Sequence, residues 1–313
     1  MKGLEFDDVL LIPQPSTVNS RDEVDISVKL SDFLTLEVPI VASPMKGITG
    51  VDMIEQMNDL GGIGILHRFY DSNTIFNKDL NYLEDKVVNF GVAIGLNDWG
   101  KANRSLEAGA KIICVDVANG YLENVQEFVS LIKNRINDGG FESLIMAGNV
   151  CEWQGAIRLQ GAGADIIRIG IGTGHLCTTR TVTGVGVPQL TALQNAKLST
   201  SKLIADGGIR TSGDAVKSFV FGADLVMLGT LLASTYASSN NGIIYGMASR
   251  KLQGEYYHVT KSVEGISKQV EKPYQSLKDF IDEFAYGIKS ACTYLDANNL
   301  SELKSVEYIE VNK

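Results

Sequence analysis

Residues 111–149, KIICVDVANGYLENVQEFVSLIKNRINDGGFESLIMAGN, decide the fold of this 313-residue chain. The stretch opens with the apolar run 111–117 and closes with the apolar run 143–149. Near-continuous apolar strands of this kind are typical of a parallel sheet that is covered on both faces. Between the two runs, residues 122–136 show a helical pattern. The stretch therefore reads as strand, helix and strand, the repeating unit of α/β proteins.

The same unit recurs along the whole chain. Apolar runs that end in small or polar residues occupy residues 39–45, 61–66, 88–95, 111–117, 143–149, 165–171, 202–208 and 224–230. Helical patterns between them include 99–108, 153–159 and 212–221. Eight such units predict an α/β fold, a (β/α)8 TIM barrel. An open doubly wound sheet is the alternative, but no GxGxxG fingerprint follows the first run.

Two segments fall outside the eight units. A chain of this length could hold two average domains, but a single barrel often reaches it, so we predict one catalytic domain over residues 1–313. Residues 1–38 form an N-terminal extension, which we expect to cap the bottom of the barrel or to reach a neighbouring subunit. Residues 231–280 are too long and polar for an ordinary loop. We expect them to form an active-site flap after the eighth strand.

Composition excludes several classes of protein. The four cysteines are widely spaced, without a CxxC motif, which argues against a zinc site or a disulfide scaffold and for a reducing compartment. The N-terminus MKGLEFDDVLL carries acids where a signal peptide needs bases, and no apolar run reaches the length of a membrane span. A net charge of −9 disfavours non-specific nucleic-acid binding. We expect a soluble cytoplasmic protein that binds neither membranes nor nucleic acid.

Residues 170–186, GIGTGHLCTTRTVTGVG, place a cysteine in a glycine-rich loop directly after an apolar run. Glycine allows the backbone to turn tightly and to aim polar groups at a ligand. Cys177 is followed by Thr178, Thr179 and Arg180, and hydroxyls with a nearby cation favour a reactive thiolate. Cys177 is therefore predicted to be a nucleophile rather than a packed core thiol. Arg180 could equally pair with a carboxylate, and the sequence leaves both roles open.

Polar and glycine residues also follow the last two apolar runs. Asp206-Gly207-Gly208 and Gly229-Thr230 match the phosphate site that TIM barrels build after these strands, and Asp206 suits ribose hydroxyls. Ordinary turns are the alternative, because Gly and Asp favour turns. His67 is given no role, and His175 is expected to be exposed beside the cysteine. Glu264 is either a purine-binding or acid–base carboxylate or a solvated surface charge.

The loop GIGTGHLCTTRTVTGVGVPQ resembles that of the IMP dehydrogenase/GMP reductase family. The resemblance covers almost the whole chain, through FDDVLLIPQPST (6–17), SRDEVD (20–25), DVANGY (116–121), IMAGNV (145–150), IADGG (204–208), YGMAS (245–249) and ACTY (291–294). It implies a TIM-barrel enzyme, usually a homotetramer. In that family the loop cysteine attacks C2 of a purine nucleotide to form a thioimidate, and a nicotinamide cofactor exchanges hydride with C2.

The resemblance favours the reductase branch of the family. Dehydrogenases usually carry a CBS pair after the second strand, but here the third apolar run begins about 20 residues after His67. They also use an Arg-Tyr pair in the flap to activate water, and residues 231–280 contain no such dipeptide. DVANGY and SACTY (290–294) are reductase-like. The implied reaction is NADPH-dependent reductive deamination of GMP to IMP and ammonia.

Two alternatives remain open. One is an IMP dehydrogenase without CBS domains, which would convert IMP, NAD and water to XMP. The other is a reductase for a different 2-aminopurine nucleotide. It is suggested by Lys46, Thr173 and His175, where relatives commonly carry Asp, Pro and Ser.

The resemblance implies a role for many individual residues. Cys177 would be the nucleophile, with Thr179 and Glu264 as a proton-relay pair. The nucleotide would contact Asp206, Gly207, Gly208, Gly229, Thr230, Gly246, Met247, Ala248, Lys261, Ser262, Val263 and Gly265. The NADPH side would comprise Asp116, Val117, Ala118, Gly170, Ile171, Ser290 and Arg68, joined by Ser20 and Arg21 from a neighbouring subunit. A monovalent cation, K⁺, would bind at Gly172, Gly174, Cys177 and Arg180.

Overall fold

Eight parallel strands close into a barrel in the computed structural model, which describes residues 3–240, 242–246, 249, 265–270 and 275–311. Each strand pairs with the next along the chain, and the last pairs with the first. The predicted (β/α)8 barrel is confirmed, and the open sheet was the wrong alternative. The barrel strands are β4 (Ile40–Ala42), β5 (Ile63–Leu66), β6 (Phe90–Ile94), β7 (Ile112–Asp116), β8 (Leu144–Val150), β9 (Ile166–Ile169), β10 (Lys202–Asp206) and β11 (Leu225–Leu228).

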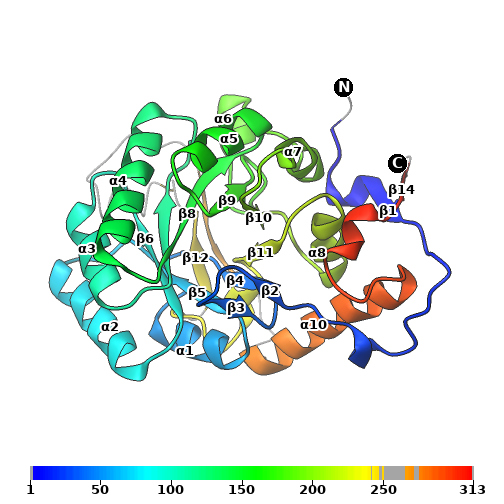
Figure 1. The fold of residues 1–313 in the computed structure, drawn as a ribbon, viewed down its shortest axis with the longest axis horizontal. Helices are drawn as coiled ribbons and strands as arrows, with labels where there is room; N and C mark the ends of the chain where they lie inside the picture. The colour runs from blue at the N-terminus through cyan, green and yellow to red at the C-terminus, as the bar shows by residue number, and fades with distance from the viewer. Residues whose placement is uncertain (1–2, 241, 247–248, 250–264, 271–274, 312–313) are drawn as a thin grey trace.

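Helices surround the barrel, as Figure 1 shows. They are α1 (Val51–Asp59), α2 (Asn73–Lys86), α3 (Trp99–Glu107), α4 (Glu123–Gly139), α5 (Trp153–Gly161), α6 (Thr179–Thr183), α7 (Gln189–Ala196), α8 (Ser212–Val220) and α10 (Leu277–Tyr294). Because these helices cover the outer face and side chains fill the interior, every residue of β6, β7 and β9 is buried. This burial explains why the strand sequences are apolar almost throughout.

Helix α4 illustrates how the sequence sets helix limits. Its buried residues, Val125, Phe128, Val129, Ile132 and Ile136, recur every three or four positions and so form one face against the barrel. The helix ends at Gly140, which adopts a left-handed conformation with φ 63°. Glycine takes this conformation without steric cost, so it terminates the helix. The helical pattern predicted for residues 122–136 is therefore confirmed.

The N-terminal extension reaches two different places. Short strands β2 (Val28–Lys29) and β3 (Thr35–Leu36) form a hairpin, and the Val38 N–H donates to the Gly61 carbonyl just before β5. The hairpin thus lies at the amino-terminal ends of the barrel strands. Residues 3–8, which include the 3-10 turn η1 (Phe6–Asp8), instead contact α7 and α8, where the Lys217 ammonium donates to the Phe6 carbonyl over 2.8 Å.

The two ends of the chain meet beside α8 (Figure 1). Strand β1 (Val9–Leu11) pairs antiparallel with β14 (Tyr308–Glu310). The 3-10 turn η2 (Arg21–Glu23) packs on α10, and η4 (Glu302–Ser305) precedes β14. The N-terminal extension is therefore held to the barrel at several points along its length.

The segment predicted as a flap contains regular structure at both of its ends. After the 3-10 turn η3 (Leu232–Ser234), β12 (Ile243–Tyr245) pairs antiparallel with β13 (Ser267–Gln269). The predicted end at residue 280 is wrong, because α10 already begins at Leu277. The Ser276 hydroxyl caps that helix by accepting the Asp279 N–H over 3.0 Å. Within the described residues, no helix is both long and apolar enough to cross a membrane.

Candidate active site

A cavity of about 270 Å³ opens at the carboxyl ends of the barrel strands. TIM barrels place their chemistry at this end, and the residues predicted from the sequence gather here. Those that line the cavity are Arg68, Asp116, Val117, Ala118, Gly170, Ile171, Gly172, Gly174, Cys177, Thr179, Asp206, Gly207, Gly208, Gly229, Thr230, Gly246 and Gly265. These residues, which are far apart in the sequence, therefore line one continuous cavity.

Cys177 lies in the cavity wall within the cysteine loop, which we define as residues 170–188 between β9 and α7. Its Sγ is 3.1 Å from Oγ1 of Thr179, the first residue of α6. Cys177 is exposed, whereas the other three cysteines, Cys114, Cys151 and Cys292, are buried. Burial raises the pKa of Cys114 to about 12 and that of Cys292 to about 11. Cys177 is thus the accessible thiol of the chain.

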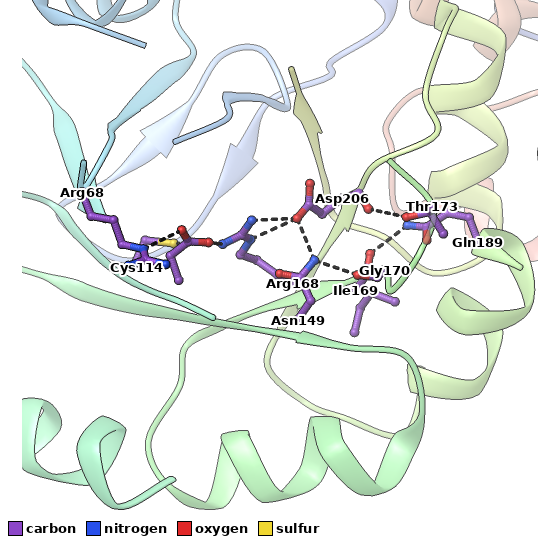
Figure 2. Close-up of polar contacts among 10 residues, drawn as sticks. Arg68, Cys114, Asn149, Arg168, Ile169, Gly170, Thr173, Gln189 and Asp206 are labelled. Carbon is purple, nitrogen blue, oxygen red and sulfur yellow. Dashed lines mark hydrogen bonds and ion pairs between the residues drawn. The ribbon is translucent and has the colours of Figure 1, made fainter. Parts of the chain in front are cut away.

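The loop after β10 packs tightly against the cysteine loop. A side chain at Gly207 would place its Cβ 2.7 Å from the Thr173 hydroxyl and 2.9 Å from the Gly174 nitrogen, so only glycine fits. The Thr173 hydroxyl also donates to the Asp206 carbonyl over 3.0 Å, a bond that proline at this position could not make (Figure 2). The cysteine loop and the loop after β10, which is predicted to bind phosphate, therefore form one continuous wall of the cavity.

A buried arginine connects the two sides of the cavity (Figure 2). Arg168 projects from β9 and is 5% exposed. Its Nη1 donates to Asp116 Oδ1 over 2.5 Å, and its Nη2 donates to Asp206 Oδ2 over 2.8 Å. Asn149 adds a bond from Nδ2 to the same Oδ2, also over 2.8 Å. Arg168 thus fixes one carboxylate at the end of β7 and another at the end of β10.

The buried Arg168 and its neighbours form ion pairs of opposite charge. Burial by itself favours the neutral form of Asp116, but the adjacent Arg168 and Arg68 guanidinium groups outweigh it and lower the pKa of that carboxyl. The two carboxylates in turn raise the pKa of Arg168. The adjacent guanidinium groups therefore offset the desolvation of the buried Asp116 carboxylate. Asp206 Oδ1 accepts no hydrogen bond from the described residues, which leaves one oxygen for a ligand hydroxyl.

The residues just before β13 contact the residues on either side of Cys177. The Gly265 N–H donates to the Thr178 hydroxyl over 2.7 Å, and the Ile266 N–H donates to the Leu176 carbonyl over 3.2 Å. The described ends of the flap thus flank Cys177. Six residues predicted from the sequence lie outside the described residues, namely Met247, Ala248, Lys261, Ser262, Val263 and Glu264.

Known proteins are similar to this chain over nearly its whole length. The family model described as "IMP dehydrogenase / GMP reductase domain" matches residues 3–313. The chain belongs to the IMP dehydrogenase/GMP reductase family. It is 33% identical to proteins named GMP reductase from Streptococcus pneumoniae (strain P1031) and from Streptococcus suis (strain 98HAH33). Each alignment covers 98% of this chain and 94% of the relative.

Two cationic side chains, those of Arg68 and Lys101, lie near Asp116. Arg68 Nε is 3.3 Å from Asp116 Oδ2, and the Lys101 ammonium donates to the Arg68 carbonyl over 3.3 Å. Ser20, Arg21 and Ser290 do not line the cavity of their own chain. Arg21 lies over the Tyr286 ring at 4.9 Å, on the same helix as Ser290. These residues belong to the η2–α10 surface.

Of the two roles considered for Arg180, the structure shows pairing with a carboxylate. Its Nη1 forms an ion pair with Glu5 Oε1, and its Nη2 donates to the Val187 carbonyl over 2.7 Å. The carbonyls expected to bind a cation are partly engaged, since the Gly174 oxygen accepts the Cys177 N–H over 3.0 Å. In the described part of the chain, no three His, Cys, Asp or Glu side chains are grouped as a metal site.

His67, for which we predicted no role, is a neutral packed residue. Its ring stacks on Tyr70 with centroids 4.6 Å apart, and its buried Nδ1 has no hydrogen-bond partner among the described residues. Burial, reinforced by Lys46 and Lys101, lowers the pKa of His67 to about 3. A side chain in this state is unsuited to proton transfer at neutral pH.

We expect the His67 ring to stay neutral in the folded protein at every pH above about 5. Its folded pKa lies below the unfolded value of 6.5, so the unfolded state binds more protons and the free energy of unfolding falls as pH drops below 6.5. NMR titration of the histidine rings tests this, with the His67 signal assigned as the one lost in His67→Gln. A midpoint between pH 6 and 7 for that signal would contradict the assignment.

Sequence reasoning missed the connecting residues Arg168 and Gln189. Arg168 lies in a run that predicts an apolar strand, although an arginine among isoleucines is itself a signal. A buried charge is costly unless it is paired, so its presence in β9 requires carboxylates at neighbouring strand ends. Gln189 carries no comparable signal, because uncharged amides are common on surfaces as well.

Proposed function

We propose that this protein is a GMP reductase, which converts GMP and NADPH to IMP, ammonia and NADP⁺ through a thioimidate at Cys177. The observation that carries the proposal is the exposed Cys177 thiol, held 3.1 Å from Thr179 in the wall of the barrel cavity. Relatives named GMP reductase that match nearly the whole chain support it. The absence of an Arg-Tyr dipeptide from the sequence argues against the water activation of a dehydrogenase.

The nucleotide would occupy the side of the cavity formed by the last two barrel strands. Asp206 Oδ1 would accept a ribose hydroxyl, while Arg168 and Asn149 hold the other oxygen of that carboxylate. Gly207 and Gly208 adopt left-handed conformations with φ 96° and 82°, which bring backbone close to a bound phosphate. Gly229 and Thr230 precede η3, whose amino-terminal end would add further amides. This arrangement suits a purine nucleoside monophosphate.

The first half of the reaction would be performed by side chains of the cysteine loop and flap. The Cys177 thiolate forms a bond to C2 of the purine and gives a tetrahedral adduct. An amine leaves well only when protonated, so Thr179 and Glu264 would deliver a proton to the 2-amino nitrogen. Ammonia then departs and leaves the thioimidate. When bound, NADPH supplies a hydride to C2, after which the C–S bond breaks and Cys177 leaves as the thiolate.

The residues beside Asp116 fit a phosphorylated cofactor. Val117 and Ala118 line the same cavity as Cys177, and Arg68 and Lys101 place two cations near Asp116. Bidentate arginine suits the 2′-phosphate that distinguishes NADPH from NADH. Ser20, Arg21 and Ser290 would complete this site across a subunit boundary. This arrangement requires an oligomer, which we propose is a homotetramer.

Two further features would assist turnover. The carbonyls of Gly172, Gly174, Cys177 and Arg180 would hold K⁺ and order the cysteine loop. The flap would close over the nucleotide and exclude water, which a reductase needs because hydrolysis of the thioimidate would release XMP. Free thiols in a chain without a disulfide agree with action in the reducing cytoplasm.

Replacing Glu264 by Gln should slow deamination by about 100-fold or more while leaving hydride transfer nearly unchanged, because only the amine needs a proton to leave. Deamination is followed as ammonia release in a single turnover of GMP. Hydride transfer is followed separately as NADPH formation from IMP and NADP⁺ without ammonia, which stops at the thioimidate. Glu255→Gln, the same change elsewhere in the flap, serves as the control. Equal slowing of both steps would contradict a selective proton relay.

The proposed function is tested by reduced-nicotinamide absorbance in K⁺ buffer. GMP with NADPH should give loss of absorbance and one ammonia per NADPH consumed. A rise in absorbance with IMP and NAD⁺, accompanied by XMP, would instead identify a dehydrogenase. Silence with both pairs would overturn the proposal in favour of another 2-aminopurine nucleotide.

A further inference from the structure

A carboxylate of the N-terminal segment, that of Glu5, contacts the cysteine loop. Glu5 Oε1 pairs with Nη1 of Arg180, the second residue of α6. Glu5 Oε2 accepts the backbone N–H of Gln189 over 3.0 Å, where α7 begins. The Glu5 side chain therefore binds the chain at two places. One is Arg180, three residues after Cys177, and the other is Gln189, which directly follows the cysteine loop.

Two glycines leave a path for Arg180 to reach Glu5. A Cβ at Gly172 would lie 2.5 Å from Arg180 Cγ, and a Cβ at Gly186 would lie 2.7 Å from the same atom. Both distances are too short for any side chain, so the aliphatic part of Arg180 passes between the two ends of the loop. The guanidinium then donates to the Val187 carbonyl over 2.7 Å as well as to Glu5.

Gln189 connects this arrangement to the barrel. Its side chain is fully buried, and Nε2 donates to the carbonyl of Ile169, the last residue of β9, over 2.8 Å (Figure 2). The backbone of Leu4 pairs with the same turn, since its N–H donates to the Thr191 hydroxyl over 2.7 Å. Hydrogen bonds and an ion pair therefore connect Glu5 to Gln189 at the end of the loop and to Arg180 in α6, and Gln189 in turn binds Ile169 at the start of the loop.

We propose that Glu5 is a positioning residue for catalysis, which acts through Arg180 to hold Cys177 and Thr179 in their reactive arrangement. The expected change in kcat rests on the proposed function, because it is measured as GMP reduction. Arg180 directly follows Thr179, so a shift of its guanidinium turns the start of α6 and moves Thr179 relative to the thiol. Misplacement of reacting groups by about 1 Å costs as much as 100-fold in rate.

The Glu5–Arg180 ion pair is too exposed to act mainly by stabilising the fold. The Glu5 and Arg180 side chains are 36% and 37% exposed. Ion pairs this accessible contribute little to global stability because water screens them. Loss of the pair should therefore loosen the cysteine loop without unfolding the barrel.

Glu5→Gln tests the proposal, because the amide keeps an acceptor for Gln189 but loses the charge that binds Arg180. Asp7→Asn is the matched control, since it breaks the two-bond ion pair of the same segment with Arg210, which does not involve the cysteine loop. We expect amide hydrogen exchange in residues 170–188 to accelerate at least about fivefold in Glu5→Gln, with barrel strands unchanged. kcat should fall about tenfold and the KM for GMP should stay within twofold.

Arg180→Lys provides a second variant, which keeps the charge but lacks the fork that bonds Glu5 and Val187 together. It should accelerate exchange in the same residues, and Asp7→Asn should match the unmodified protein in both readouts. Unchanged exchange in Glu5→Gln, or acceleration spread equally over the barrel strands, would overturn the proposal. The exchange measurement needs no turnover, so failure of GMP reduction in the unmodified protein would overturn the proposed function separately.

Discussion

Cys177→Ala should lower kcat by at least about 10⁴-fold while GMP still binds with an affinity within severalfold of normal. The loss is large because no other described group near C2 can form the covalent intermediate, and removal of a nucleophile typically costs this much. Binding persists because Asp206, Gly207, Gly208, Gly229 and Thr230, which would hold ribose and phosphate, do not depend on the thiol. Steady-state absorbance measures turnover, and calorimetric titration with GMP measures affinity.

A control variant separates the loss of the Cys177 thiol from the general effect of replacing a cysteine by alanine. Cys292 is buried in α10, outside the cavity wall, so Cys292→Ala makes the same chemical change at a site without a proposed role. It should retain nearly normal kcat and GMP affinity. Turnover by Cys177→Ala at a rate near that of Cys292→Ala would show that the covalent route is wrong.

Arg168→Met should have the second largest effect, on stability and on activity together. The substitution removes the cation that the buried Asp116 carboxylate shares with the partly exposed Asp206 carboxylate, and removing one partner of a buried ion pair costs about 3–5 kcal/mol. Asp206 would also lose two of the bonds that orient its carboxylate, which we propose binds the ribose. We therefore expect a fall in melting temperature and at least about a 100-fold fall in kcat/KM for GMP.

The pH dependence of this loss identifies its electrostatic cause. In the unmodified protein the pKa of Asp116 lies below its usual 3.8, so its contribution to stability is present above that pH and is lost as pH falls through the folded pKa. In Arg168→Met, only Arg68 remains to offset the burial of Asp116, so the pKa of this carboxyl should rise. The variant is then destabilised most at pH values where Asp116 is ionised. The difference in melting temperature should be largest near pH 7 and should shrink toward pH 4.

Two comparisons sharpen this prediction. Lys133→Met breaks a partly exposed ion pair with Asp165 outside the cavity wall and should cost about 1 kcal/mol or less. Arg168→Lys keeps the charge but cannot bond both carboxylates, so its stability should lie between those of the unmodified protein and Arg168→Met. A melting-temperature difference for Arg168→Met that is independent of pH would point to lost packing instead of unpaired carboxylates.

The barrel was predictable because its signal is local. Each strand is a short buried run, and helices such as α4 carry an apolar face that repeats every three or four residues. The positions of Cys177, Asp206 and Gly229 at strand ends also follow from local sequence once the barrel is assumed. The flap boundary was placed wrongly because the polar residues before Leu277 hide the cap at Ser276, where α10 begins.

The connections between these positions could not be predicted, because they join residues far apart in the chain. Glu5 is 175 residues from Arg180, and Arg168 is 52 residues from Asp116. No periodic pattern records such pairs, and Glu5 alone is compatible with a solvated surface. The folded barrel brings them together through the closure of its strands and the docking of the N-terminal segment.

Transfer of a labelled hydride is the most direct test of the central claim that C2 of GMP is reduced at Cys177. The protein would be incubated with GMP and NADPH deuterated at C4, in separate reactions with each face labelled. With one of the two labels, IMP should carry a single deuterium at C2, and one ammonia should be released per IMP formed. IMP without deuterium from either label, or XMP formed from IMP and NAD⁺, would contradict the account.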